Sequence, residues 1–230
     1  NFIVLNDIDF LNYTDQRLGW GYRYFYGTID FQGYTMKVYS SKSDGTNADW
    51  RRINRIESSA VIKNIVIDVN INNELLNNNL NGFIINNYGT IENVMMIVHD
   101  THNSQTPQLY TSPLVDTNQL TGRIRNFAIK LDGDVHLYND SSIMSRVNYG
   151  TIENGYIYGG NVIVDYNLTS GTTRTVSLIQ RYGGVKSSIN NVYTLSSIMF
   201  PNNQTYDLSG LFAYETYGKI SNSYAYGDVN

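Results

Sequence analysis

Apolar and polar residues alternate in short segments along this chain, and the same alternation recurs after each copy of an Ile-x-Asn tripeptide. The first and third residues after the Asn are mostly apolar, as Ile65, Ile67, Val94 and Met96 illustrate. The second and fourth residues are more often polar or aromatic. Because successive side chains of a strand point to opposite faces, this pattern predicts strands with one face in a core and the other toward solvent.

The tripeptide belongs to an internal repeat. The heptapeptide NYGTIEN occurs at residues 87–93 and again 61 positions later, at residues 148–154. The Asn-to-Asn spacings of the tripeptide are 29, 33, 28, 37 and 31 residues. Recurrence at roughly thirty residues with variable insertions is the signature of a solenoid. The six tripeptides end at Asn64, Asn93, Asn126, Asn154, Asn191 and Asn222.

Each repeat predicts one coil of an all-β fold. A short apolar strand is followed by a turn with Tyr or Gly, then by the Ile-x-Asn strand and a looser stretch, which together suggest three strands of about five residues. Stacked parallel strands favour a right-handed parallel β-helix of about six to seven coils. We expect a single domain over residues 1–230, with 1–55 as the first coils or a cap and 56–230 as the repeats.

The Asn column is expected to be structural. Stacked at one corner of successive coils, these amides can exchange hydrogen bonds along the stack, and Asn accepts the bent backbone of a turn. Gly89, Gly150 and Gly218 are expected to supply positive φ angles at the same corner.

Composition narrows the classes of partner. The 230 residues include 19 Gly and 20 Tyr but no Cys, and the formal net charge is -4. Without clustered Lys and Arg, nucleic acid and anionic membranes are poor candidates, and the absence of Cys excludes disulfides and thiol catalysis. No apolar run approaches the length of about 20 residues that a membrane span needs. The chain begins without Met and stops within a strand-like pattern, so we expect a fragment of a larger protein.

The last repeat, SGLFAYETYGKISNSYAYGDVN (209–230), resembles the GLUG motif of bacterial cell-surface adhesins and of the N-terminal regions of Gram-positive IgA-specific metalloproteases. The segments VLNDIDF (4–10) and YGTIDFQGYTMKVY (26–39) look like those that precede GLUG repeats. Ala213 stands where the motif has its second Gly, and Phe31 stands where the early run has a Gly. The resemblance implies an extracellular β-helical module, secreted or on the cell surface.

The expected function is that of a non-catalytic binding or stalk module of a bacterial adhesin, without a cofactor. Its expected partner is a host glycan or a host surface protein, immunoglobulin included. An alternative is the substrate-recognition region of a secreted IgA-type metalloprotease whose catalytic domain lies elsewhere, since His-Glu-x-x-His is absent from these residues. A phage fibre or a polysaccharide-degrading β-helix is a third, weaker alternative.

The favoured binding feature is a strip of tyrosines on the outer face of the Ile-x-Asn strands. Tyr combines an apolar ring with a hydroxyl group, so a row of rings can hold sugar rings or a partner protein. Alternatively, the rings stack on one another and stabilise the sheet. The members of this strip are Tyr156, Tyr158, Tyr193, Tyr224 and Tyr226.

Other candidates are weaker. Asp132 and Asp134 flank a Gly, as calcium ligands do, but a turn explains them equally well. His99 and His102 have a spacing that can join two metal ligands, although an exposed loop is the simpler interpretation. Glu92, Arg125 and Glu153 are expected to stack as ion pairs. Two further groups are Tyr residues of an N-terminal cap (22, 24, 26 and 34) and Asn-x-Ser/Thr sites (Asn12, Asn139, Asn167 and Asn203).

Overall fold

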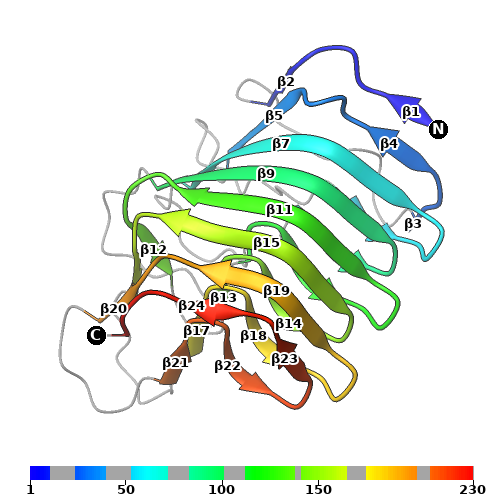
Figure 1. The fold of residues 1–230 in the computed structure, drawn as a ribbon. Coiled ribbons are helices and arrows are strands. Elements are labelled where there is room, and N and C mark those ends of the chain that lie inside the picture. The colour runs from blue at the N-terminus through cyan, green and yellow to red at the C-terminus, as the bar shows by residue number, and fades with distance from the viewer. Residues whose placement is uncertain are drawn as a thin grey trace.

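The chain winds into a right-handed parallel β-helix, which confirms the predicted fold class (Figure 1). The computed structural model describes residues 1–10, 24–39, 53–71, 83–100, 112–137, 141–164, 175–200 and 208–229. These ranges contain 24 strands and no helix. The four Asn-x-Ser/Thr sites, His102 and Tyr22 lie outside them.

The largest sheet carries the Ile-x-Asn strands and runs the whole length of the helix (Figure 1). Its eight-strand path is β1, β4, β7, β9, β11, β15, β19 and β23, with β2, β5 and β24 beside it. Its strands span Phe2–Ile3 (β1), Ile8–Asp9 (β2), Thr28–Asp30 (β4), Thr35–Tyr39 (β5), Val61–Ile71 (β7), Thr90–Asp100 (β9), Arg123–Leu131 (β11), Thr151–Gly159 (β15), Ser188–Thr194 (β19), Lys219–Ser221 (β23) and Tyr224–Ala225 (β24).

Three smaller sheets close the coil. The second has seven strands, and the third and fourth have three each. The second contains Tyr24–Phe25 (β3), Ile53–Ile56 (β6), Ile84–Asn87 (β8), Val115–Asn118 (β10), Ser145–Asn148 (β14), Gln180–Gly183 (β18) and Ala213–Thr216 (β22). The third contains Val135–Leu137 (β12), Val162–Val164 (β16) and Ile198–Met199 (β20), and the fourth contains Ser141–Ser142 (β13), Thr175–Ser177 (β17) and Leu208–Gly210 (β21).

The coil therefore differs in two details from the expectation. A coil such as β11 to β14 has four strands rather than three, because the looser stretch after the Ile-x-Asn strand contains two short strands of its own. There are about five turns rather than six to seven, because the six Asn corners bound only five intervals. Two initial rungs of the same sheet precede β7: β4 and β5 pair with β7, and β1 and β2 pair in turn with β4 and β5.

The core forms one continuous cluster from Phe10 to Ile198. The Ile of each tripeptide is buried from β7 to β19, with exposed fractions of at most 1 %. Residues at the first and third positions after each Asn are also buried over these rungs, as predicted. Gly155 is the one residue without a side chain in this set, and a Cβ atom there would lie 2.4 Å from the ring of Phe127, which occupies the space beneath it.

In each of the six repeats the corner is bent by Asn, and one rung before Asn64 it is bent by Gln32 and Gly33. All six tripeptide Asn residues have φ angles between 49° and 56°. The expectation that Gly89, Gly150 and Gly218 supply positive φ is wrong, since none of them has it. They are required instead by close approach between coils: a Cβ atom on Gly150 would lie 2.2 Å from the carbonyl oxygen of Gly122. Asn tolerates the left-handed region, which leaves Gly free for positions where backbones nearly touch.

Two kinds of turn alternate where the second sheet leads into the largest one. Four-residue turns at 57–60, 119–122 and 184–187 are closed by backbone hydrogen bonds of 2.8, 2.7 and 2.9 Å. Short Tyr-Gly turns precede, separate and follow these longer turns, at 26–27, 88–89, 149–150 and 217–218. Each Gly except Gly27 fits against the carbonyl oxygens of the preceding longer turn. This alternation explains why the heptapeptide recurs after two coils rather than one.

A second polar ladder is buried inside the coil at the end of the second sheet. The side-chain amide nitrogens of Asn87, Asn118 and Asn148 each donate to the side chain of the next coil, at 2.7, 2.8 and 2.7 Å. The last acceptor is Gln180, which itself donates to Thr216 at 3.2 Å. The four amide side chains are fully buried. Since a buried amide without partners is costly, this ladder ties the coils together.

Candidate binding face

The exposed Asn ladder forms the edge of the candidate face. Each side-chain amide nitrogen donates to the side-chain oxygen of the Asn one coil nearer the N-terminus. The distances are 2.8 Å for Asn93 to Asn64, 3.1 Å for Asn126 to Asn93, 3.4 Å for Asn154 to Asn126 and 3.0 Å for Asn191 to Asn154. The donors point toward the N-terminus, opposite to those of the buried ladder. Amide groups are thus presented to solvent in a regular row.

Both ends of this ladder have distinct partners. At the N-terminal end, Asp30 accepts from the Asn64 amide at 2.9 Å and contacts Lys63 at 3.2 Å. At the C-terminal end, Asn222 donates to Asn190 at 3.0 Å instead of to Asn191. The oxygen of Asn191 accepts the hydroxyl of Tyr193. This hydrogen bond joins the ladder to the tyrosine strip.

The tyrosine strip has the predicted register. Tyr156, Tyr193 and Tyr224 occupy one column of the sheet on β15, β19 and β24. The rings of Tyr193 and Tyr224 are in contact at a tilt of 41°, with centroids 4.4 Å apart, whereas the ring of Tyr156 contacts that of Tyr158 with centroids 5.3 Å apart. Tyr156, Tyr224 and Tyr226 are 42, 55 and 78 % exposed. The rings therefore support one another in pairs and still present accessible surface.

A shallow, open groove runs between the ladder and the strip. Its lining extends over four rungs, from β9 to β19. The floor of the hollow is formed by Ala128 and Gly155. Because both residues are small, space is left between Met95 on one side and Tyr156 and Tyr193 on the other. Asn93, Asn126, Asn154 and Asn191 line its polar side. Aromatic rings beside a row of amides suit a ligand with apolar faces and hydroxyl groups.

Acid is expected to destabilise this end of the ladder. The hydrogen bond from Asn64 holds the pKa of Asp30 below its ordinary value, with Gln32 and Lys63 adding to the effect. A lowered folded-state pKa stabilises the fold above the unfolded pKa of about 3.9, and this contribution is lost as the pH falls through the folded value. Asp30→Asn keeps the acceptor oxygen, so denaturant titrations should show a weaker loss of stability below pH 4 than in the wild type. An identical acid response in this variant would contradict the assignment.

The weak metal candidates are not brought together. Asp132 binds Lys130 at 2.6 Å and His99 at 2.9 Å, and the Lys130 interaction lowers the pKa of Asp132. Asp134 instead accepts from the backbone and side chain of Asn161. His99 also contacts Asp68, at 3.0 Å. Within the described ranges no group of three or more acidic or His residues is placed to hold a metal ion.

The expected Glu-Arg-Glu stack is only half formed. Arg125 contacts Glu92 at 2.6 Å. Among the described residues it makes no ion pair with Glu153, although the two are adjacent in register. The Arg125 side chain therefore joins β11 to β9 rather than to β15.

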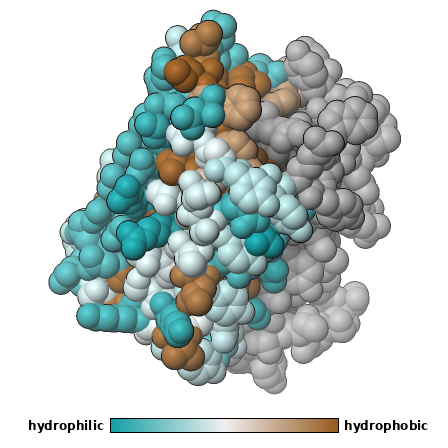
Figure 2. Space-filling model, turned by 90° about the vertical axis from the view of Figure 1, so that its right-hand side faces the viewer, coloured by the Kyte–Doolittle hydropathy of each residue, from teal (hydrophilic) through white to brown (hydrophobic). Residues whose placement is uncertain are grey.

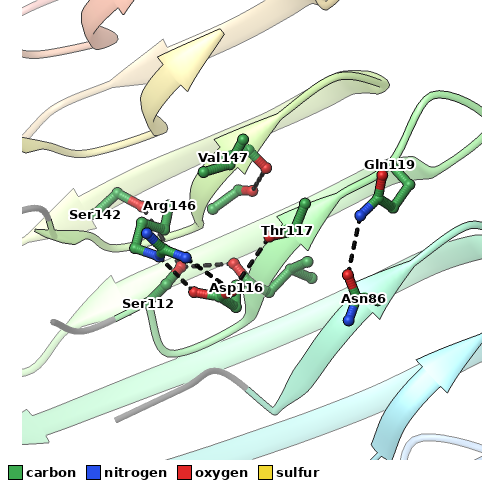
Figure 3. Close-up of polar contacts among 10 residues, drawn as sticks. Asn86, Ser112, Asp116, Thr117, Gln119, Ser142, Arg146 and Val147 are labelled. Atoms are coloured by element: carbon green, nitrogen blue, oxygen red, sulfur yellow. Dashed lines mark hydrogen bonds and ion pairs between the residues drawn. The ribbon is translucent and has the colours of Figure 1, made fainter. Parts of the chain in front are cut away.

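Sequence reasoning missed a polar cluster on the second sheet, shown in Figure 3. Arg146 donates to both carboxylate oxygens of Asp116, at 2.6 and 3.2 Å, and Thr117 adds a third hydrogen bond. Asp116 is only 7 % exposed. The contact joins β14 to β10. The sequence hardly indicates it, because Asp116 and Arg146 occupy the same position of successive repeats but are different residue types.

Comparison of the chain with protein-family models, with curated proteins and with solved structures finds no match. The GLUG assignment therefore stays a prediction that depends on the motif residues. Over the ranges that the structure describes, no helix has the length and apolar character needed to cross a membrane.

Proposed function

We propose that this protein is a non-catalytic binding module displayed outside a bacterial cell, on its surface or in secreted form. Its partner is a host glycan or a glycosylated host surface protein. The observation that carries the proposal is the groove over four rungs, bordered by tyrosine rings on one side and by Asn amides on the other. A β-helix holds these groups at fixed spacing, so little conformational freedom is lost on binding.

The chemistry of the groove supports a saccharide. Sugar rings have apolar faces that lie against Tyr rings, and hydroxyl groups that pair with amides. The groove lining contains no charged side chain. An uncharged lining of this kind gives no advantage to nucleic acid or to another polyanion.

The test is binding of this protein to a glycan array on which immunoglobulin A and host matrix proteins are also spotted. We expect the wild type to bind at least one of these, and Tyr156→Ala/Tyr193→Ala/Tyr224→Ala to lose that binding while keeping its fold. Because Tyr193 also bonds to Asn191, Tyr156→Ala/Tyr224→Ala is measured beside it. A folded wild type that binds nothing would refute the proposal, as would full binding by both variants.

A second variant fills the groove without removing any contact. Ala128→Leu places a larger aliphatic side chain in the hollow between Met95 and Tyr156. Affinity should fall by about tenfold or more, since ligand and side chain compete for the same space. Lys130→Leu, two residues farther along β11 on the same face, is the matched control and should bind as the wild type does. Equal affinity for all three proteins would place the ligand elsewhere.

A further inference from the structure

A second aromatic surface, separate from the groove, lies where the strands of the largest sheet begin. Figure 2 looks onto this side, whose surface is mostly teal and pale, with brown groups near its top and lower end. Tyr149, Tyr182 and Tyr217 form a continuous chain of ring contacts here, with centroids 6.2 and 6.0 Å apart. We call these three residues the corner cluster. Tyr149 is 40 % and Tyr217 59 % exposed.

The alternating turns surround the corner tyrosines unequally: Tyr149 lies between the longer turns 119–122 and 184–187, and Tyr217 follows the last of them. The longer turns project on either side of each internal Tyr-Gly turn, and their central residues are exposed, including Leu120 and Val185. Thr121 donates to the backbone oxygen of Tyr88 at 2.8 Å and so fixes one projecting turn against its neighbour. Gln119 of the same turn donates to the side chain of Asn86 at 2.9 Å (Figure 3). Both hydrogen bonds hold the projecting turn 119–122 in place.

Gly184 determines how the ring of Tyr149 lies. A Cβ atom at residue 184 would be 2.4 Å from Cδ1 and 2.9 Å from Cε1 of that ring. The ring therefore lies against the bare backbone of the next coil, with its other side toward solvent. Two coils beyond Tyr149, Tyr217 donates its hydroxyl hydrogen to Glu215, and this hydrogen bond raises the pKa of Tyr217. The phenol stays protonated.

Spacing indicates the class of ligand. Tyr-Gly turns recur every second rung, which corresponds to about 9.6 Å along the axis. An extended β-linked polysaccharide turns alternate rings over, so equivalent ring faces also recur every second sugar. Charges of both signs border the cluster, because Glu215 accepts the hydroxyl of Tyr217 and the exposed Lys186 lies in the projecting turn between Tyr149 and Tyr217. The described part of the corner therefore has no field of one sign that would favour a polyanion or a polycation.

We propose that the corner cluster is a second binding surface, which takes an uncharged, linear β-linked polysaccharide lying along the axis of the β-helix across the alternating turns. Sugar rings stack on Tyr149 and Tyr217, and the side chains of the projecting turns border the chain. The site is independent of the groove beside the Asn ladder, since it uses the start of the sheet rather than its middle.

Calorimetric titration of the whole chain with β-1,4-linked glucose and N-acetylglucosamine oligosaccharides of two, four and six units tests this proposal. Affinity for at least one series should increase with length, because the longer chains can contact Tyr149 and Tyr217 together. Tyr149→Ala/Tyr217→Ala should weaken binding of the hexasaccharide by at least about tenfold. Gly184→Ala, which displaces the Tyr149 ring but keeps it, should weaken binding by about threefold.

The groove variant Tyr156→Ala/Tyr224→Ala is the matched control and should bind the hexasaccharide normally. If this control loses binding and the corner variant does not, the groove is the only saccharide site and the second surface is refuted. Absence of binding to both oligosaccharide series, or a preference for a proline-rich peptide, whose polyproline repeat of about 9.3 Å also matches two rungs, would overturn the ligand class. Each result leaves the array test of the groove unaffected.

Discussion

Replacing Asn148 with Asp is expected to destabilise the fold by about 3 kcal/mol at pH 7, although the two side chains have nearly the same shape. Asn148 is fully buried, accepts from Asn118 and from the backbone nitrogen of Gly150, and donates to Gln180. A carboxylate keeps the acceptor but loses the donor, and places a charge among buried amides without a cation. The free energy of unfolding from chemical denaturation measures the loss.

The pH dependence of Asn148→Asp distinguishes charge from geometry. Burial raises the pKa of a carboxyl group, so the neutral form is favoured in the folded state. The deficit relative to wild type should therefore be small below the unfolded pKa of about 3.9 and grow as the pH rises above it. Asn154→Asp on the exposed ladder is the matched control, expected to change stability by less than about 1 kcal/mol. Equal effects at the two positions would contradict the distinction between the ladders.

Gly150→Ala is expected to cost about 3 kcal/mol through overlap between coils. The added Cβ atom would lie 2.2 Å from the backbone oxygen of Gly122 and 2.4 Å from that of Gln119, and neither can move without shifting a turn. Thermal unfolding compares this variant with Gly133→Ala. Gly133 has open space around it but a φ of 96°, so its substitution reports backbone strain alone, of order 1 kcal/mol. A larger loss at Gly133 would show that φ, not contact, is what matters.

The sequence predicts the tyrosine side of the candidate groove but not the hollow beside it. The column of Tyr156, Tyr193 and Tyr224 follows from counting beyond each Asn, because all residues in one register position of stacked strands share a face. The hollow beside it does not follow. It depends on Ala128 lying next to Gly155 and on the Phe127 ring filling the space below, which are contacts between coils that a single strand does not specify.

The buried ladder shows the same division. Its first two pairs involve Asn residues at equivalent positions, and the heptapeptide already contained Asn87 and Asn148 as its first residue. In the next coil the residue paired with Asn148 is Gly183, so the side-chain amide that continues the ladder comes from Gln180, three residues earlier. A Cβ atom on Gly183 would lie 2.2 Å from the Gln180 amide nitrogen, so the glycine makes room for the longer side chain.

The sequence by itself determined the β-helix, the six Asn corners and the inward and outward faces of the strands, because these depend on periodicities within each repeat. Only the tertiary structure decided which glycines avoid contact between coils, where Gln180 completes a ladder, and that two kinds of turn alternate. The physical reason is that hydrogen bonding of buried polar groups and steric fit depend on contacts between adjacent coils. The residues that meet there are about thirty positions apart, and insertions of variable length between repeats hide from the sequence which residues are paired.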